Sequence, residues 1–278
     1  MQYRTDLAVE AEDCLSELDG VDCREYVEGD VTITETLIRT RSASECTGKP
    51  IGEYVTLAMP PLTGHAFMPD ERYEMISFQL RRLLPDEGTV LVAGLGNSGV
   101  TPDALGSRTV SKILATRHIA GEYAESAGLG GLRPAAVIAA GVLGQTGIES
   151  AELLRAVCGA IEPQAVIIID ALAARDLSRL GSTVQMSSTG IAPGSGVGND
   201  RPRIDSGLLG VPVISLGVPT VVDAESIAGE KAALRGGMMV TPREIDLLID
   251  RAASLLAMAI NHALYPAVDP ADMLAIMS

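Results

Sequence analysis

Two aspartates lie at or just beyond apolar runs that predict buried strands. Asp170 ends the run 165–170, in which the five preceding residues are all apolar. Asp103 follows the run 89–93 after a glycine-rich turn, directly behind a Thr-Pro pair that is typical of a helix start. Because parallel strands present their carboxyl ends at one edge of a sheet, we expect these two side chains to lie close together.

Such a pair of carboxyl groups could hydrolyse a peptide bond if the two groups differed in pKa. The first turn of a helix would favour the ionised form of Asp103, whereas burial and mutual repulsion can raise the pKa of its partner. One group could then activate a water as general base, and the other could protonate the leaving amine. Each aspartate also has a structural interpretation: Asp103 as an ordinary helix-start acid, and Asp170 as the cap of a helix that begins at Ala171.

A glycine-rich stretch, 189–199, could in principle cradle a phosphate. It lacks the Lys-Ser/Thr pair of a P-loop, and the earlier Gly94-x-Gly96 lacks the third glycine of a dinucleotide fingerprint. The stretch 189–199 is therefore interpreted as a flexible lid or a subunit contact.

The cysteines and histidines are too scattered for a metal site or a cysteine nucleophile. No two cysteines form a C-x-x-C element, and we expect the thiols to be reduced. We expect neither a metal nor another cofactor. The residues concerned are Cys14, Cys23, Cys46, Cys158, His65, His118 and His262.

Charge and composition exclude several classes of protein. The net charge of −15 argues against a nucleic-acid surface, and the acids clustered before residue 31 indicate a solvated face or a docking surface for a basic partner. No apolar run approaches about 20 residues, so no membrane span is expected. The N-terminus lacks a signal-peptide pattern, which predicts a cytoplasmic protein.

The order of apolar runs predicts an α/β domain with a mostly parallel sheet, covered by helices on both faces. The aromatic fraction is only 3%, so the core is expected to consist of Ala, Val, Ile and Leu. Before this domain we expect a β-rich N-terminal extension. It would begin with a loosely packed arm (1–30), followed by two strands of alternating polarity that a loop or hairpin (41–52) connects. The predicted strands are 31–34, 54–57, 89–93, 135–140, 165–170 and 212–216, and the predicted helices are 70–84, 102–117, 147–161, 171–180 and 242–264.

Several motifs around these residues resemble the signatures of the germination protease family. They occur in the family's order over most of the chain, and they are highly specific together although each fragment is weak alone. The matching segments are 94–97 with 100–106 (GLGN and VTPDALG), 144–149 (GQTGIE), 169–175 (IDALAAR), 189–199 (TGIAPGSGVGN), 217–224 (GVPTVVDA) and 240–246 (VTPREID).

The resemblance implies an atypical aspartic endopeptidase with Asp103 and Asp170 as its essential residues. It implies a phosphorylase/hydrolase-like fold related to the hydrogenase maturation peptidases. It further implies a homotetramer in the spore core, made as a zymogen, that degrades the DNA-coating small acid-soluble spore proteins on germination. Asn97 and Gln145 are expected from their position to orient the water or the substrate.

The family cuts after an acidic residue and before a hydrophobic one followed by Ala, and it activates itself at a similar sequence. The segment 5–10 (TDLAVE) fits this pattern, so we expect self-cleavage between Asp6 and Leu7. Residues 1–6 would then be a propeptide, and 7–278 a single peptidase domain.

Two alternative functions belong to other classes of protein: a metal-dependent peptidase and a binding module without activity. The Gly94-x-Gly96-Asn97 segment also resembles hydrogenase maturation endopeptidases, in which acids and a histidine hold a metal. The counterpart here would be Asp103 and Asp170, with His118 as a candidate third ligand. His118 lies about 15 residues after Asp103, which is over about 20 Å along a helix and too far for a shared ligand set. The second alternative is a catalytically inactive module that binds spore proteins.

Overall fold

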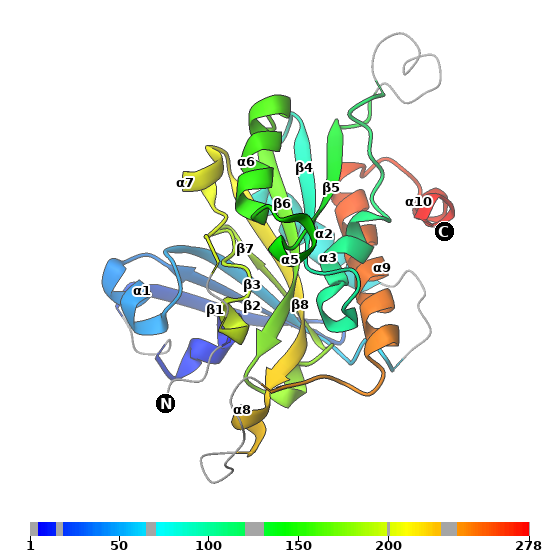
Figure 1. The fold of residues 1–278 in the computed structure, drawn as a ribbon. Coiled ribbons are helices and arrows are strands. Elements are labelled where there is room, and N and C mark those ends of the chain that lie inside the picture. The colour runs from blue at the N-terminus through cyan, green and yellow to red at the C-terminus, as the bar shows by residue number, and fades with distance from the viewer. Residues whose placement is uncertain are drawn as a thin grey trace.

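The computed structural model describes residues 5–14, 19–64, 71–119, 131–198, 201–228 and 238–277. Within them, nine strands form one sheet in the order β1-β2-β3-β7-β8-β6-β4-β5, with β9 added to β8 (Figure 1). The strands are β1 Val21–Glu28, β2 Val31–Ile38, β3 Gly52–Ala58, β4 Val90–Leu95, β5 Ala135–Gly141, β6 Ala165–Ala174, β7 Thr183–Ser187, β8 Val213–Asp223 and β9 Met239–Val240. The α-helices are α1 Arg41–Thr47, α2 Glu71–Leu83, α3 Leu105–Val110, α5 Leu143–Thr146, α6 Ser150–Ile161, α7 Ser206–Leu209, α8 Ala224–Ala228, α9 Ile245–Leu264 and α10 Pro270–Met277.

The continuous apolar runs form the parallel half of the sheet, which is buried on both faces. β5, β4, β6 and β8 pair in parallel. Alternate residues of β6 face opposite ways: Ile167 and Ile169 lie in the core built with α2, α3 and α9, and Val166 and Ile168 lie in the core built with α6 and α7. Helices therefore cover this half on both sides, as the four apolar runs predict.

The whole sheet is mixed: the predicted β-rich N-terminal extension belongs to the same sheet, so the expectation of a mostly parallel sheet is correct only for β5, β4, β6 and β8. β1, β2, β3 and β7 are all antiparallel to their neighbours, and β7 joins them to β8. β7 itself escapes prediction because its residues Thr183, Gln185 and Ser187 are polar and yet buried.

Three predicted segments adopt a different structure. The loop or hairpin expected at 41–52 is largely the helix α1, which the Thr40 side chain caps and Gly48 ends in the left-handed conformation. The helix expected at 171–180 is a continuation of β6 followed by a short 3-10 turn. The helix expected at 102–117 divides into a 3-10 turn, 101–103, and the short α3.

The N-terminal arm is not loosely packed over its described part. Leu7 and Val9 are buried against Leu172, Ala174 and Val222, at the end of β6 and β8. Further along, 21–28 pairs with β2 as an edge strand. The acidic composition of the arm concealed both features.

One helix, α9, is long and apolar enough to cross a membrane by length and composition, although no uninterrupted apolar run of that length occurs. Of its most apolar window, 72% is buried inside the protein. It packs on α2 and α3, which is the position of a core helix.

Candidate active site

Asp170 lies where two neighbouring strands separate. The last residue of β6 that pairs with β4 is Ile169, opposite Gly94, whereas β6 continues to pair with β8 as far as Ala174. From Asp170 onward, the edge of β6 that faces β4 therefore no longer pairs with β4. Asp170 is only 6% exposed, and its Oδ1 accepts a hydrogen bond from the N–H of Ala171 at 2.9 Å.

Asp103 is brought to the same place by the tight turn that follows β4. Gly96 has φ +94°, and a Cβ there would lie 1.9 Å from the carbonyl oxygen of Asp103, so only glycine permits this packing. The N–H of Asn97 donates to Oδ2 of Asp103 at 2.7 Å. Asp103 is thus the last residue of a 3-10 turn and not part of the first turn of a long helix.

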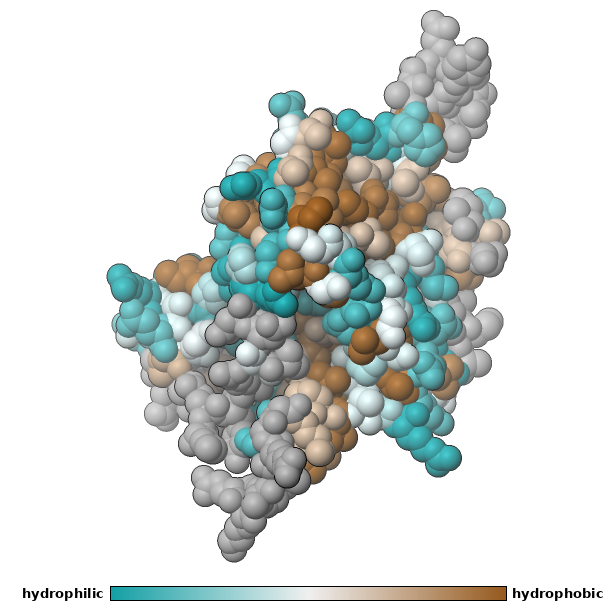
Figure 2. Space-filling view, in the orientation of Figure 1, coloured by the Kyte–Doolittle hydropathy of each residue, from teal (hydrophilic) through white to brown (hydrophobic). Residues whose placement is uncertain are grey.

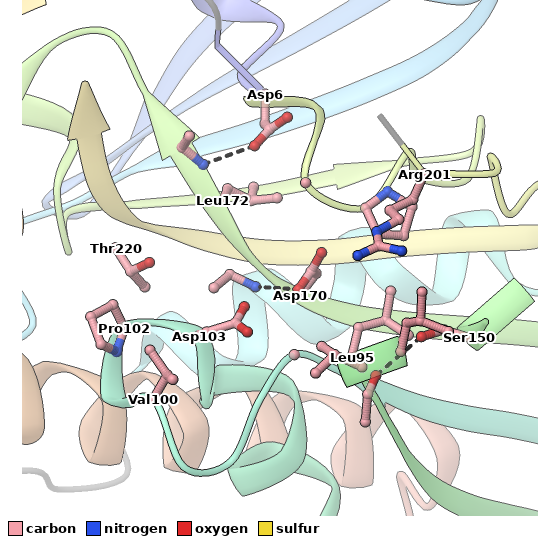
Figure 3. Close-up of a pocket in the computed structure, with 18 of the residues that line it drawn as sticks. Asp6, Leu95, Val100, Pro102, Asp103, Ser150, Asp170, Leu172, Arg201 and Thr220 are labelled. Carbon is pink, nitrogen blue, oxygen red and sulfur yellow. Dashed lines mark hydrogen bonds between the residues drawn. The ribbon is translucent and has the colours of Figure 1, made fainter. Parts of the chain in front are cut away.

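The two aspartates point toward one another in a cavity of about 450 Å³ (Figure 3). The cavity lies beyond the carboxyl ends of β4 and β5, where ligands of open α/β sheets bind. The sequence-based expectation that Asp103 and Asp170 meet at one sheet edge is confirmed in this geometry. Other lining residues are Asp6, Leu95, Val100, Pro102, Ser150, Leu172, Ala173, Arg201 and Thr220.

The environments of the two carboxyl groups shift their pKa values in the same direction by different amounts. Burial raises the pKa of Asp170 well above its ordinary value, and the charges of Asp103 and Asp6 raise it further, against the hydrogen bond from Ala171. Burial also raises the pKa of Asp103, and the hydrogen bond from Asn97 opposes that rise. Asp103 is therefore the more readily ionised member of the pair.

Asn97 and Gln145 lie together at the rim. Nε2 of Gln145 donates to Oδ1 of Asn97 at 2.6 Å, and the N–H of Gly99 donates to the same oxygen at 2.9 Å. Neither side chain lines the cavity. Their hydrogen bonds support the turn that carries Asp103, and a direct role in orienting water stays a prediction.

The predicted self-cleavage site lies beside the aspartate pair, although residues 1–4 of the expected propeptide are outside the described residues. The N–H of Asp6 donates to the carbonyl of Ala173 at 2.9 Å, and the Asp6 carboxylate accepts from the N–H of Ala173 at 2.8 Å and from the Ser195 hydroxyl at 2.9 Å. Leu7 is fully buried. The bond between Asp6 and Leu7 is thus tied to the end of β6.

Two cavity residues were missed by sequence reasoning. Arg201 lines the cavity and forms an ion pair with Glu149 at 2.8 Å. As a single arginine after the glycine-rich stretch, it belongs to no motif that would indicate a site residue. Thr220 is 1% exposed, and its hydroxyl has no hydrogen-bond partner among the described residues. A buried hydroxyl of this kind, facing a cavity, is available to a bound water or substrate. Thr220 lies within the segment 217–224 already singled out as a motif, which was its only signal.

The metal-ligand set considered from the sequence does not come together. His118 is exposed and does not line the cavity that holds Asp103 and Asp170. Across the described ranges, no three His, Cys, Asp or Glu side chains converge as ligands of one ion.

Comparisons with known proteins agree with the motifs. A family model described as "Germination protease" matches residues 2–235. Germination proteases of Clostridium tetani and Caldanaerobacter subterraneus are 38% and 41% identical to the chain. The first alignment covers 98% of each sequence, and the second covers 97% of this chain and 96% of the relative. A solved [NiFe] hydrogenase maturation protease, HycI of Thermococcus kodakarensis, aligns with 14% identity and a TM-score of 0.40, over 66% of this chain and 98% of that one.

The family match spans most of the chain, and the relatives match it nearly end to end. The chain therefore belongs to the germination protease family of endopeptidases.

Proposed function

We propose that this protein initiates the degradation of small acid-soluble spore proteins during germination, cutting after Glu or Asp and before a hydrophobic residue. The observation that carries the proposal is the pair Asp103 and Asp170, which face each other in one cavity with unequal tendencies to ionise. The family membership supports the substrate class.

The proposed mechanism assigns one role to each aspartate. Asp103 is ionised first and accepts a proton from a water held between the two groups, so that the water attacks the scissile carbonyl. Asp170, kept protonated by burial and by the neighbouring charges, donates its proton to the leaving amine. The hydroxyl of Thr220 and the guanidinium of Arg201 face the same cavity and are placed to bind the substrate backbone or the developing oxyanion.

Further parts of the proposal rest on the family. The enzyme is made in the spore core as a zymogen, cuts itself between Asp6 and Leu7, and works as a homotetramer with residues 7–278 as one peptidase domain. It needs no cofactor and does not itself bind nucleic acid or a membrane.

The test is an intact-mass assay with a purified small acid-soluble spore protein. Wild type should cut after acidic residues, and Asp103→Asn and Asp170→Asn should each lose at least about 1000-fold in rate, because a base or an acid is removed. Asp250→Asn, a surface acid on α9, is the matched control and should cut as wild type does.

Each assay is repeated with and without EDTA. Cutting that EDTA stops and a divalent metal restores would overturn the aspartate-pair mechanism in favour of the metal-dependent peptidase. Folded wild type that binds the spore protein but never cuts it would establish the inactive binding module instead.

A further inference from the structure

The cavity around the aspartate pair has two chemically different ends. Arg201 and Ser150 lie at one end, on the opposite side of the pair from Val100, Pro102 and Thr220 (Figure 3). We call the first the cationic end and the second the apolar end. A peptide whose scissile bond lies between the two aspartates therefore places one neighbouring residue at each end.

Arg201 gives the cationic end its charge. It is the one cation among the described residues that line the cavity, in a chain of net charge −15. The described contacts of its guanidinium use one of five N–H donors, in the bond from Nη1 to Oε1 of Glu149 at 2.8 Å. Because the Arg201 side chain is 32% exposed, its other donors are accessible to a second carboxylate.

The N-terminus of α6 adds positive potential at the same end. The helix begins at Ser150 and runs for 12 residues, and within the described part of the chain no side chain caps its first N–H groups. Ser150 and Ala151 both line the cavity. The N–H groups and the dipole of a helix start favour a negatively charged partner. A carboxylate side chain at this end would therefore meet a guanidinium and a helix start together.

The apolar end contains one buried hydroxyl. Val100 and Pro102 line it from the turn that carries Asp103, and Val221 lines the cavity next to Thr220 in β8. Thr220 is 1% exposed, and its hydroxyl lacks a hydrogen-bond partner among the residues that the structure describes. A buried hydroxyl of this kind normally bonds to a water or a ligand. These surroundings fit a hydrophobic side chain together with a main-chain polar group.

We propose that Arg201 selects the acid that precedes the scissile bond, and that the apolar end takes the hydrophobic residue that follows it. The inference rests on the proposed function, whose cutting pattern has an acid on one side of the bond and a hydrophobic residue on the other. One orientation of the substrate gives each residue surroundings of its own kind. The leaving amine then lies toward Thr220. Arg201 thereby contacts the substrate through its side-chain acid rather than its backbone, and Thr220 contacts the main chain.

Glu149 makes the role of Arg201 testable. Its carboxylate holds the guanidinium beside the cavity, and its negative charge opposes a second carboxylate there. Arg201→Gln and Glu149→Gln both break this ion pair, but they change the charge of the cationic end in opposite directions. If the pair only supported the surrounding loops, the two variants would behave alike.

The substrates are a small acid-soluble spore protein with one cut site and its variant with Gln in place of the acid before the cut. Intact mass follows both together and gives the ratio of their kcat/KM values. Arg201→Gln should lower the preference for the acid about 10-fold, by slowing the acidic substrate alone. Glu149→Gln should raise that preference about 3-fold, because the competing charge is gone. Arg155→Gln, at an exposed position on α6, is the control and should change neither rate.

A preference that falls in both variants, or in neither, overturns the proposal. Thermal unfolding checks that each variant is folded, and Arg201→Met serves in place of Arg201→Gln if the latter does not fold. Wild type that cuts no spore protein refutes the proposed function itself. Wild type that prefers the acid as strongly as Arg201→Gln does refutes only the assignment of Arg201.

The apolar end is tested with a third substrate, which has Ser in place of the hydrophobic residue after the cut. Val100 is 48% exposed, so Val100→Ser is compatible with folding. It should lower the preference for the hydrophobic residue about 5-fold and leave the preference for the acid unchanged. Arg201→Gln should do the reverse. If each variant instead changes the preference assigned to the other, the substrate lies in the opposite orientation and the proposal is wrong.

Discussion

At the scale of single residues, Asp103 and Asp170 differ in how they are solvated and bonded. The main-chain N–H of Asn97, in the turn after β4, stabilises the ionised form of Asp103. Among the described residues, Asp170 accepts a hydrogen bond only from the N–H of the next residue, and it is almost fully buried. The pair resembles other carboxylate pairs in which one proton is shared, because like charges at close range resist joint ionisation.

The raised pKa of Asp170 makes a prediction about stability. A group whose pKa is higher in the folded than in the unfolded protein contributes stability that is complete below its unfolded pKa, near 4, and is lost as pH rises through its folded pKa. Asp170→Asn removes this titration. The variant should therefore gain stability relative to wild type as pH rises, by about 1.4 kcal/mol for each unit by which the pKa is raised.

The measurement is urea unfolding of both proteins between pH 4 and pH 8. The difference in unfolding free energy should grow with pH and then level off. Asp250→Asn should show no such trend, since Asp250 is exposed on α9. A difference that stays constant with pH would mean that Asp170 is already ionised throughout this range.

At the scale of elements, β7 holds the N-terminal segment through one buried amide. Nε2 of Gln185 donates to the carbonyl of Asp6 at 2.9 Å, and its Oε1 accepts the N–H of Ala8 at 2.5 Å. The amide thus spans the bond between Asp6 and Leu7 and holds it against Ala173, three residues beyond Asp170. If the chain cuts itself at this bond as proposed, we expect the contacts of Gln185 with Asp6 and Ala8 to break first.

Gln185→Leu should therefore speed self-cleavage several-fold while lowering stability by about 1–3 kcal/mol, because two buried backbone groups lose their partner. Intact mass followed over time reports the loss of residues 1–6, and thermal unfolding reports stability. Gln79→Leu is the matched control: Gln79 is also buried and hydrogen-bonded, but to Tyr26 and Arg82, far from the segment. It should lower stability without faster cutting. Slower self-cleavage in Gln185→Leu would instead identify its amide as a donor to the reacting carbonyl.

Sequence patterns predicted best the elements whose surroundings stay the same along their whole length. The four parallel strands are continuous apolar runs because both of their faces are covered, and this placed Asp170 at the right edge of the sheet. The prediction failed after Asp170, where β6 loses β4 as a neighbour. The Ala-rich residues there suit a helix or a strand equally, and a helix was expected. They remain a strand that pairs with β8 on one side and contacts segment 5–10 on the other. Asp103 was found from its turn, but Thr220 and Arg201 reach the cavity only through long-range packing.

At the scale of the whole molecule, the sheet has two unlike ends. β1, at one end, is acidic and mostly exposed. β5, at the other end, pairs only with β4 among the described residues and carries apolar side chains, and Figure 2 shows apolar atoms gathered where β5 and α6 meet. The patch consists of the partly buried Ala136, Ile138, Leu153 and Val157. Edge strands of this composition are normally protected by a further layer of protein.

The proposed homotetramer would supply that layer. Val157→Lys should reduce the assembly to smaller species in size-exclusion chromatography with light scattering, because a lysine in the patch must be desolvated on association. Val27→Lys, at the 69% exposed position on β1, carries the same change at the opposite end of the sheet and should leave the assembly intact. The long lysine side chain can keep its charge in water in the free subunit, so thermal unfolding should change little in either variant. A tetramer that survives Val157→Lys but dissociates in Val27→Lys would place the interface on the acidic edge and leave the β5 patch uncovered.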